Sequence, residues 1–262
     1  MIRLVDEIKA CKENVPIWTY LSKSDLKNRF RRSRLGILWP MLHQLAFSLG
    51  AGIIWAAVFH LEPGEFIPFL TLGFAIWGFI AGAMTEGCGA FVIAHGYLKQ
   101  LPLPQSIFIF RTLLTQTIYL AIGMATALGV LFYFGQLSIS GLVFGSPGLL
   151  ILIVYAYGAI GTFAYLGLRY RDLQHGLAGI FSLLFVITPV IYPAEVLIKK
   201  GFGVVIYGNP FASLIEIVRH PILHGQFADS SHYLISSAFT LLFIVFRFQL
   251  GSRWSRYVPF WS

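Results

Sequence analysis

The chain has 262 residues, of which 57% are hydrophobic and only 11% are charged, with a formal net charge of +8. A soluble domain carries about 25% charged residues because its surface faces water. The low share therefore indicates that lipid surrounds most of this chain. The positive charge does not indicate a nucleic-acid binder, since the basic residues stand beside apolar segments rather than on one soluble face.

The first 36 residues form a basic segment. They contain nine Lys or Arg and no apolar run of the kind that a signal peptide carries, so we expect no signal peptide. Residues 15–34 are expected to form an amphipathic helix on the membrane surface, with Trp18 and Leu21 on one side. Leu26 falls outside that side, and a solvated basic tail is the alternative. The basic stripe that would meet anionic headgroups is Lys23, Lys27, Arg31 and Arg34.

A helix that spans a membrane needs about 20 mostly apolar residues. Six segments meet that description, and no linker or internal repeat divides them. We therefore expect an all-α integral membrane protein that is a single transmembrane domain over residues 1–262. Its predicted parts are a cytoplasmic or interfacial segment 1–36, a bundle 37–251 and a cytoplasmic tail 252–262. The predicted spans of the bundle are Ile37–Phe59, Phe66–Thr85, Ile107–Phe134, Leu149–Leu168, Leu177–Tyr192 and Tyr233–Leu250.

The distribution of Lys and Arg predicts the orientation of the spans. With the N-terminus in the cytoplasm, sixteen of the nineteen basic residues fall on the cytoplasmic side, and the exceptions are Lys199, Lys200 and Arg219. Cytoplasmic loops are enriched in Lys and Arg. Because six crossings are an even number, we expect both termini in the cytoplasm.

Two connections differ from ordinary loops. Between the second and third spans, Pro102 and Pro104 disfavour a continuous helix, and a short helix around Tyr97–Leu101 would present a contact to a soluble partner. Residues 194–225, between the fifth and sixth spans, are too apolar for an exposed loop and too often broken by Gly and Pro to span. Irregular backbone at membrane depth is tolerated only inside protein or along a water-filled path. We therefore expect two re-entrant half-helices in this region, which would form a gate or line a pathway rather than face lipid.

No catalytic motif is found in the sequence. A GxxxxGK[ST] phosphate-binding loop is absent, so the chain is not expected to hydrolyse ATP by that route. Cys11 and Cys88 lack the spacing of metal ligands or of a disulfide framework. His220 and His224 lie four residues apart, but without a third ligand a metal site is not expected.

Two ionisable residues lie near the ends of the second and third spans, Glu86 and Arg111. Charges near the membrane core are usually paired and often functional. We expect a Glu86–Arg111 ion pair that holds the two helices together, with a role in gating as the alternative.

Aromatic residues make up 16% of the chain. Packing or the interfacial belt is the simpler interpretation of any single ring. Some rings recur at helical spacing, however, and would form flat faces against which sugar rings could stack. The candidates are Trp55 and Phe59 in the first span, Phe74 and Trp77 in the second, and Phe181, Phe185 and Tyr192 on one face of the fifth.

Several short motifs follow one another and together cover most of the chain. Each is modest alone, and the order in which they occur makes the set specific. They are DLKNRFRRSRLGILWP (Asp25–Pro40), LPLP (Leu101–Pro104) with Arg111, RYRDLQH (Arg169–His175), TPVIYP (Thr188–Pro193), NPF (Asn209–Phe211), Arg219 and LHG (Leu223–Gly225).

With these motifs the chain resembles the permease subunits of type-2 ABC transporters that export lipid-linked polysaccharides, namely the O-antigen, capsule and teichoic-acid exporters. The RYRD and TPVIYP motifs are closer to the O-antigen and teichoic-acid permeases. The resemblance implies a homodimer in the bacterial inner membrane that binds two copies of a separate cytoplasmic ABC ATPase. ATP and Mg would be held by the ATPase, and this chain would bind no cofactor and no nucleic acid. The substrate would be a lipid-linked polysaccharide that passes along an aromatic channel at the dimer interface.

The resemblance also implies roles for particular residues. The expected substrate channel contains Trp55, Phe59, Trp77, Phe181, Phe185 and Tyr192. The expected ATPase contacts are Arg29, Arg31, Tyr97, Leu98, Lys99 and Leu101. Structural or gating roles are expected for Glu86, Arg111, Arg169, Asp172, Asn209, Pro210 and Arg219.

Two other functions stay open on the sequence. A type-2 ABC permease for a small drug or a lipid would share the fold and the ATPase partner. A membrane-embedded enzyme acting on a lipid carrier would need acidic or histidine side chains that converge at one membrane face. Glu86, Asp172 and the histidines are dispersed along the chain, which disfavours the enzyme.

Overall fold

The structure is a computed structural model that describes residues 4–94, 96, 103–194, 201, 203 and 208–261. Every regular element among these residues is a helix. The helices are α1 (Leu4–Glu13), α2 (Val15–Phe30), α3 (Leu38–Phe59), α4 (Pro63–Ile93), α6 (Ser106–Tyr133), α7 (Ile139–Arg169), α8 (Leu173–Ile187), α11 (Pro210–His224), α12 (Ser230–Trp254), the 3-10 helix η1 (Ser255–Tyr257) and α13 (Val258–Trp261).

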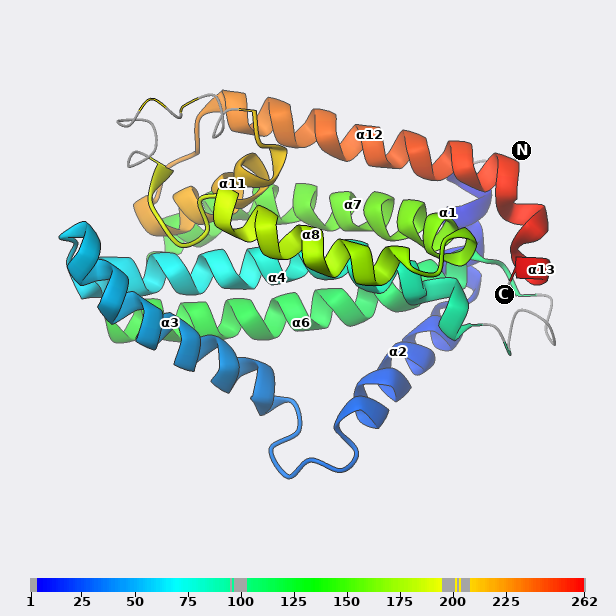
Figure 1. Cartoon of the computed structure of the whole chain (residues 1–262), viewed down its shortest axis with the longest axis horizontal. Coiled ribbons are helices and arrows are strands. Elements are labelled where there is room, and N and C mark those ends of the chain that lie inside the picture. The colour runs from blue at the N-terminus through cyan, green and yellow to red at the C-terminus, as the bar shows by residue number, and fades with distance from the viewer. Residues whose placement is uncertain are drawn as a thin grey trace.

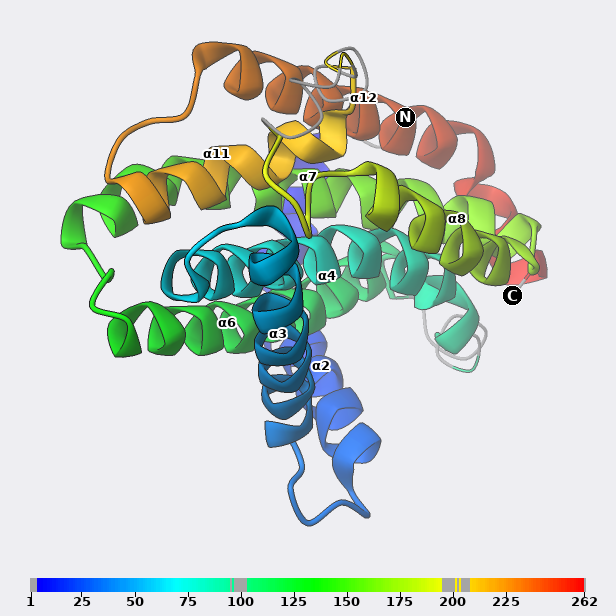
Figure 2. The same ribbon diagram turned by 60° about the vertical axis from the view of Figure 1, so that its left-hand side comes forward.

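The long helices α4, α6, α7 and α12 run along the long axis of the molecule, with α4, α7 and α12 in one chain direction and α6 in the opposite one (Figure 1). α3 crosses this bundle at an angle, and the end of α2 and the start of α3, with the connection between them, project away from the bundle (Figure 2). α1 and α13 lie at the end of the bundle where α7 finishes and α8 begins, which we call the terminal end. α11 lies at the opposite end.

In the part of the chain that the structure describes, five helices are long and apolar enough to cross a membrane, and they confirm the predicted class of all-α integral membrane protein. They are α3, α4, α6, α7 and the continuous segment of α12 with η1. α3 begins one residue after the predicted start of the first span and ends at the predicted Phe59. α4 begins earlier than predicted, because Pro63 occupies the first turn, where its missing N–H costs nothing.

The predicted fifth span corresponds to a shorter helix, α8, which has 15 residues and ends at Ile187. Thr188 leaves the helical conformation with a ψ of 139°, because a residue before proline is disfavoured in the α region. A helix of this length extends about 22 Å, whereas the hydrocarbon core of a bilayer is about 30 Å thick. α8 alone is therefore too short to cross.

α7 is longer than predicted because it begins at Ile139 and carries Pro147 within the helix. A row of glycines near its start lies directly against α11. A Cβ atom on Gly148 would be 2.2 Å from the carbonyl oxygen of Ile217, and one on Gly141 would be 2.6 Å from that of Ile222. Small residues allow helix backbones in a membrane to approach this closely. α11 is thus fixed to α7 by backbone contact.

The helix predicted over residues 15–34 is present as α2, which ends at Phe30, and its position on the membrane surface stays a prediction. Arg31 and Arg34 follow it in a non-helical connection to α3 and are exposed. α2 packs against α6 with Leu21 and Ser22 buried. Within the predicted re-entrant region 194–225, α11 is a helix, and most of residues 195–207 lie outside the described residues.

Candidate functional site

A cavity of about 740 Å³ lies between α3, α4, α6 and α8, and we call it the α3–α8 cavity. Its volume is in the range of small-molecule sites. One part of its wall is aromatic, and the part nearest the terminal end is polar. The residues that line it include Arg29, His43, Gln44, Phe47, Phe74, Trp77, Gly78, Gly82, Glu86, Gln116, Tyr119, Phe181, Ser182 and Phe185.

The aromatic part is built by α4 and α8. The ring centroid of Trp77 lies 5.8 Å from that of Phe181 and 5.9 Å from that of Phe185. Phe74 stacks on Phe185 with centroids 6.0 Å apart, and Phe47 of α3 meets the Phe74 ring edge to face at 5.0 Å. The structure therefore brings together three rings of the predicted channel, Trp77, Phe181 and Phe185. Their contact with substrate stays a prediction.

Two glycines on α4 leave room for the cavity. A Cβ atom on Gly78 would meet nothing within 4 Å, so this position faces open space. One turn later, a Cβ atom on Gly82 would lie 2.5 Å from Oε1 of Gln116. Gly82 thus lets the polar Gln116 side chain of α6 reach the cavity wall.

α3 is held against the bundle by a polar contact and a row of small residues. Nε2 of Gln44 donates to the carbonyl oxygens of Thr71 in α4 at 2.9 Å and of Gly123 in α6 at 3.1 Å. Ser48, Gly52 and Ala56 continue the same face at four-residue spacing and are buried. The rest of α3 is largely exposed within this chain.

The polar part of the cavity is centred on Arg29 of α2. Nη2 of Arg29 lies 2.9 Å from Oε1 of Glu86, and Nη1 donates to the hydroxyl of Tyr119 at 3.2 Å. The hydrogen bond with Glu86 raises the pKa of the Arg29 guanidinium. This end of the cavity therefore offers a cation, a carboxylate and a phenol within one network.

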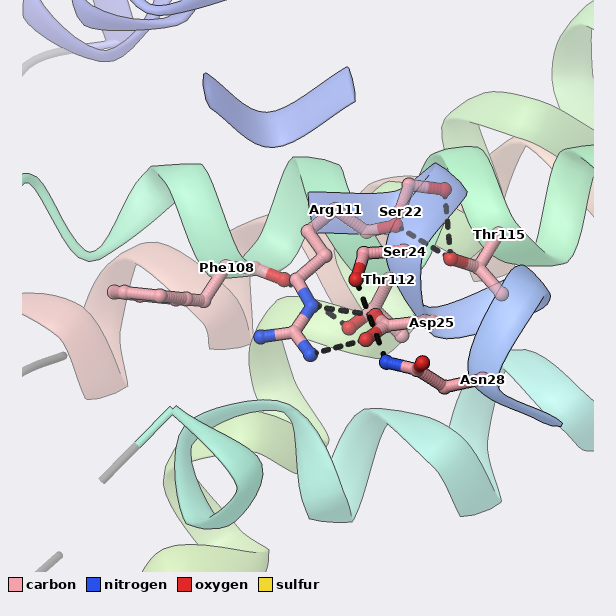
Figure 3. Close-up of polar contacts among 8 residues, drawn as sticks. All are labelled: Ser22, Ser24, Asp25, Asn28, Phe108, Arg111, Thr112 and Thr115. Carbon is pink, nitrogen blue, oxygen red and sulfur yellow. Dashed lines mark hydrogen bonds and ion pairs between the residues drawn. The ribbon is translucent and has the colours of Figure 1, made fainter. Parts of the chain in front are cut away.

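The predicted Glu86–Arg111 ion pair is wrong. Arg111 instead makes a bidentate pair with Asp25 of α2, with Nε–Oδ2 and Nη2–Oδ1 distances of 2.5 and 2.6 Å (Figure 3). Because α2 packs on α6, Asp25 of α2 pairs with Arg111. Arg29 of the same helix pairs with Glu86. Ser22 and Thr115 add a hydroxyl contact of 2.8 Å beside the pair (Figure 3). Both charges are thus partnered by α2, which is joined to α4 and to α6.

At the end opposite to the terminal end, Asn209 caps α11. Its side chain accepts a hydrogen bond from the backbone N–H of Phe211 and donates to Thr188 at 2.8 Å, while Pro210 occupies the first turn. Arg219 is 1% exposed and donates to the carbonyl oxygen of Pro189 at 3.0 Å. These contacts attach α11 to the turn that follows α8.

Arg219 has two further partners. It bonds to Glu216 at 2.8 Å, and its guanidinium lies 3.8 Å from the ring centroid of Phe69 in α4. The side chain therefore joins α11, α4 and the turn after α8. The structural or gating role expected for Arg219 stays a prediction.

The remaining predicted channel rings do not line the α3–α8 cavity. Trp55 and Phe59 stack on each other at 5.5 Å near the end of α3, and Phe59 meets the ring of Phe66 at 6.0 Å. Tyr192 is not on α8, since the helix has already ended, and its hydroxyl bonds to the carbonyl oxygen of Ile187 at 2.6 Å. The prediction that Tyr192 shares a helix face with Phe181 is therefore wrong.

Other predicted site residues lie at the terminal end. Arg169 ends α7 among aromatic rings, and Asp172 precedes α8 at its N-cap position without a side-chain cap. Arg31 is exposed beyond α2. The expected ATPase contacts Tyr97, Leu98, Lys99 and Leu101 lie outside the described residues. In the part of the chain that the structure describes, no three His, Cys, Asp or Glu side chains are grouped as metal ligands.

Sequence reasoning missed several residues of the cavity and its surroundings. Three of them are polar side chains within predicted spans, namely Gln44, Gln116 and Tyr119. A polar residue in a span is a sign of a functional or packing role, so each could have been chosen from the sequence. Tyr119 follows Arg111 by eight residues, which places both on one face of a helix. Asp25 is the one acidic residue among the basic positions 23–34, and that isolation marks it as a partner for a cation.

The helices and the cavity define the class of this chain: an integral membrane protein with a cavity of small-molecule size between its helices. No protein-family model matches the sequence. The chain is similar to the O-antigen export system permease protein RfbA of Klebsiella pneumoniae, with 25% identity over 206 residues that cover 78% of this chain and 79% of that protein. RfbA of Myxococcus xanthus is 22% identical over 249 residues, 93% of each chain. The polysialic acid transport protein KpsM of Escherichia coli is 26% identical over 228 residues, 84% of this chain and 87% of that protein.

These relatives confirm the resemblance to polysaccharide export permeases that the order of the motifs indicated. The matched residues cover most of the chain and most of each relative. The names of the relatives describe transport proteins, which agrees with a transport subunit rather than an enzyme.

Proposed function

We propose that this chain is the membrane subunit of an ATP-driven exporter that moves a lipid-linked polysaccharide, O-antigen-like, across the cytoplasmic membrane. The observation that carries the proposal is the α3–α8 cavity in a chain similar to O-antigen and polysialic acid export permeases. Trp77, Phe181 and Phe185 offer apolar faces to sugar rings, and Arg29, Glu86 and Gln116 offer hydrogen-bonding groups to sugar hydroxyls. Such a mixed lining suits a polymer that must slide rather than stay bound.

The proposed active form is a homodimer. α3 contributes to the cavity wall with one face and leaves large apolar side chains exposed on the other, such as Ile53 and Ile54. Exposed side chains of α8 include Leu183 and Val186. A second copy that packs on the α3 and α8 side would close the cavity into a channel between the two chains, and lipid would cover the rest.

The proposed topology has six crossings, with both termini in the cytoplasm. α8 makes the fifth crossing together with the residues after it, whose turn is fixed to α11 by Asn209 and Arg219. α11 belongs to a re-entrant region that closes the outer side. The terminal end of the bundle is then cytoplasmic, in agreement with the distribution of Lys and Arg.

The proposed partner is a cytoplasmic ABC ATPase, present in two copies, which binds ATP and Mg. It would contact α2, with Arg29 and Arg31, and the connection around Tyr97–Leu101. Asp25–Arg111 and Arg29–Glu86 would transmit a movement of α2 to α6 and α4. This route connects the ATPase to the wall of the cavity without a hinge inside the bundle.

Deleting the gene in its own host tests the proposal. We expect one surface polysaccharide to disappear while its lipid-linked form accumulates on the cytoplasmic side, and the intact gene to restore the surface polymer. A loss of polymer without internal accumulation would indicate an enzyme of synthesis. An unchanged surface with altered drug sensitivity or lipid content would indicate a permease for small molecules. Either outcome would contradict the proposed function.

A further inference from the structure

A second cavity, of about 390 Å³, lies at the terminal end of the bundle, and we call it the α7–α13 cavity. It is formed by the last residues of α7, the two residues after them and the C-terminal helix α13, so it is separate from the α3–α8 cavity. Its lining is Leu168, Arg169, Tyr170, Arg171 and Trp261. Among the residues that the structure describes, the lining thus contains two guanidinium groups and no carboxylate.

Aromatic rings hold Arg169 in place. Its guanidinium carbon lies 5.1 Å from the ring centroid of Trp261, 5.4 Å from that of Trp254 and 5.6 Å from that of Tyr170. Its Nε also donates to the hydroxyl of Tyr170 at 3.3 Å. Rings orient a guanidinium without neutralising it, and the positive charge stays available to an anion.

Arg171 joins α7 to the C-terminal helix. Its Nη2 donates to the backbone carbonyl oxygen of Trp261 at 3.4 Å, and its side chain is otherwise exposed. Over the described ranges, the ion pairs within 4.0 Å involve neither Arg169 nor Arg171. Asp172 follows in the chain but does not line the cavity. Among the described residues, the two arginines that line this cavity therefore have no carboxylate partner within 4.0 Å.

The surroundings of the cavity suit the membrane interface. α7 is a helix long and apolar enough to span a membrane, and its last residue is Arg169. Phe260, which precedes Trp261 in α13, is 82% exposed. Tyr and Trp are enriched where a span leaves the hydrocarbon core. Basic residues next to the end of a span attract anionic lipid, and a planar guanidinium matches the oxygens of a phosphate.

We propose that the α7–α13 cavity binds the phosphate headgroup of an anionic membrane lipid. Arg169 and Arg171 bond to the phosphate oxygens, the Trp261 ring closes one wall, and Phe260 lies against the acyl chains. Because the cavity is shared by α7 and α13, the lipid holds the C-terminal segment on the bundle. This site is independent of the polymer path.

The test measures lipid binding to the purified full-length chain in detergent by native mass spectrometry. Phosphatidylglycerol and phosphatidylcholine are titrated separately, since they differ in net charge. We expect the chain to retain phosphatidylglycerol and R169Q/R171Q to bind it at least about tenfold more weakly. The matched control is R253Q/R256Q, which removes two exposed arginines at the same end that do not line the cavity. We expect the control to stay within about twofold of the native chain.

Several outcomes would overturn the proposal. Equal losses in the two double variants would mean that charge alone attracts the lipid, and equal binding of the two lipids would remove headgroup recognition. Displacement of phosphatidylglycerol by millimolar inorganic phosphate would indicate a site for a free anion. Unchanged lipid binding by R169Q/R171Q with loss of the ATPase partner would indicate a protein-docking surface. If R169Q/R171Q does not fold, the single variant R171Q, at an exposed position, is held to the same criteria.

Discussion

The two sides of the bundle use the same residue type in opposite ways. On the side of α7, glycine allows helix backbones to come close together. A Cβ atom on Gly148 would lie 2.2 Å from a carbonyl oxygen of α11, and one on Gly158 would lie 2.9 Å from the backbone nitrogen of Ile244 in α12. On the side of α3, Gly78 faces open space. Gly148 and Gly158 thus allow close backbone packing on one side, whereas Gly78 leaves space open on the other.

This difference in packing between the α7 side and the α3 side indicates which side can take part in transport. Protein interiors are packed as densely as organic crystals and contain few voids. α7, α11 and α12 follow that rule and form a scaffold. The α3–α8 cavity departs from it, and its wall combines rings such as Trp77 with polar groups such as Gln116. A gap of about 740 Å³ with such a lining indicates a site for a molecule rather than loose packing.

The largest effect should come from closing the tight side. G148A would place a Cβ atom against backbone that no side-chain rotation can relieve, so we expect a loss of about 2–3 kcal/mol or more in the free energy of unfolding. Thermal unfolding in detergent measures it. G129A, at an exposed position of α6 with nothing within 4 Å, is the control, and its stability should stay the same or rise by up to about 1 kcal/mol. Equal behaviour of the two variants would remove the distinction between the sides.

Filling the open side should abolish export without harming the fold. G78L would put a side chain into the α3–α8 cavity, where nothing lies within 4 Å of its Cβ atom. We expect loss of most surface polysaccharide with a normal yield of folded protein. G129L, the same substitution outside the cavity, should export normally. Normal export by G78L would mean that the polymer does not use this cavity.

The rings outside the cavity should matter less. Trp55 and Phe59 stack near the end of α3, beyond the cavity lining. If the polymer leaves past them, replacing both with Ala should lower the rate at which polymer reaches the surface several-fold and leave assembly with the ATPase unchanged. Pulse labelling of the surface polymer measures the rate. If polymer reaches the surface of the double variant at the same rate as in the native protein, Trp55 and Phe59 are not part of the polymer path.

The smallest effect on stability is expected at the Arg29–Glu86 pair. Both side chains are partly exposed, at 52% and 34%, and such pairs contribute about 1 kcal/mol or less. R29Q should therefore unfold nearly as the native chain does, but should export less polymer per ATP hydrolysed, because α2 loses its connection to α4. The exchange R29E/E86R should recover part of the coupling. Full coupling in R29Q would show that movement reaches the cavity by another route.

The sequence predicted the features that depend on local patterns. α3 was placed within one residue, because Leu38–Phe59 is mostly apolar and contains no Asp, Glu, Lys or Arg. The start of α7 was missed, because Gly145, Pro147 and Gly148 resemble a loop until α11 is known to lie against them. Single-chain periodicity carries no information on that contact.

The sequence predicted only part of the candidate site, because the site depends both on spacing within helices and on how the helices pack. Trp77, Phe181 and Phe185 were chosen by helical spacing, and they meet because α4 and α8 are neighbours. The partner of Arg111 was predicted wrongly, since nothing in the sequence places α2 beside α6. Long-range ion pairs depend on how helices pack, and the spacing of charges along the chain does not determine it.

The most direct test of the polymer path is photo-crosslinking during export. A benzophenone-bearing phenylalanine is introduced at Phe181, in the cavity wall, or at Phe246, an exposed residue of α12 outside it. After irradiation of exporting cells, the chain is purified and stained for attached polysaccharide. We predict a polysaccharide adduct at position 181 and none at position 246. No adduct at position 181, or equal adducts at both, would contradict the assignment of the α3–α8 cavity as the path.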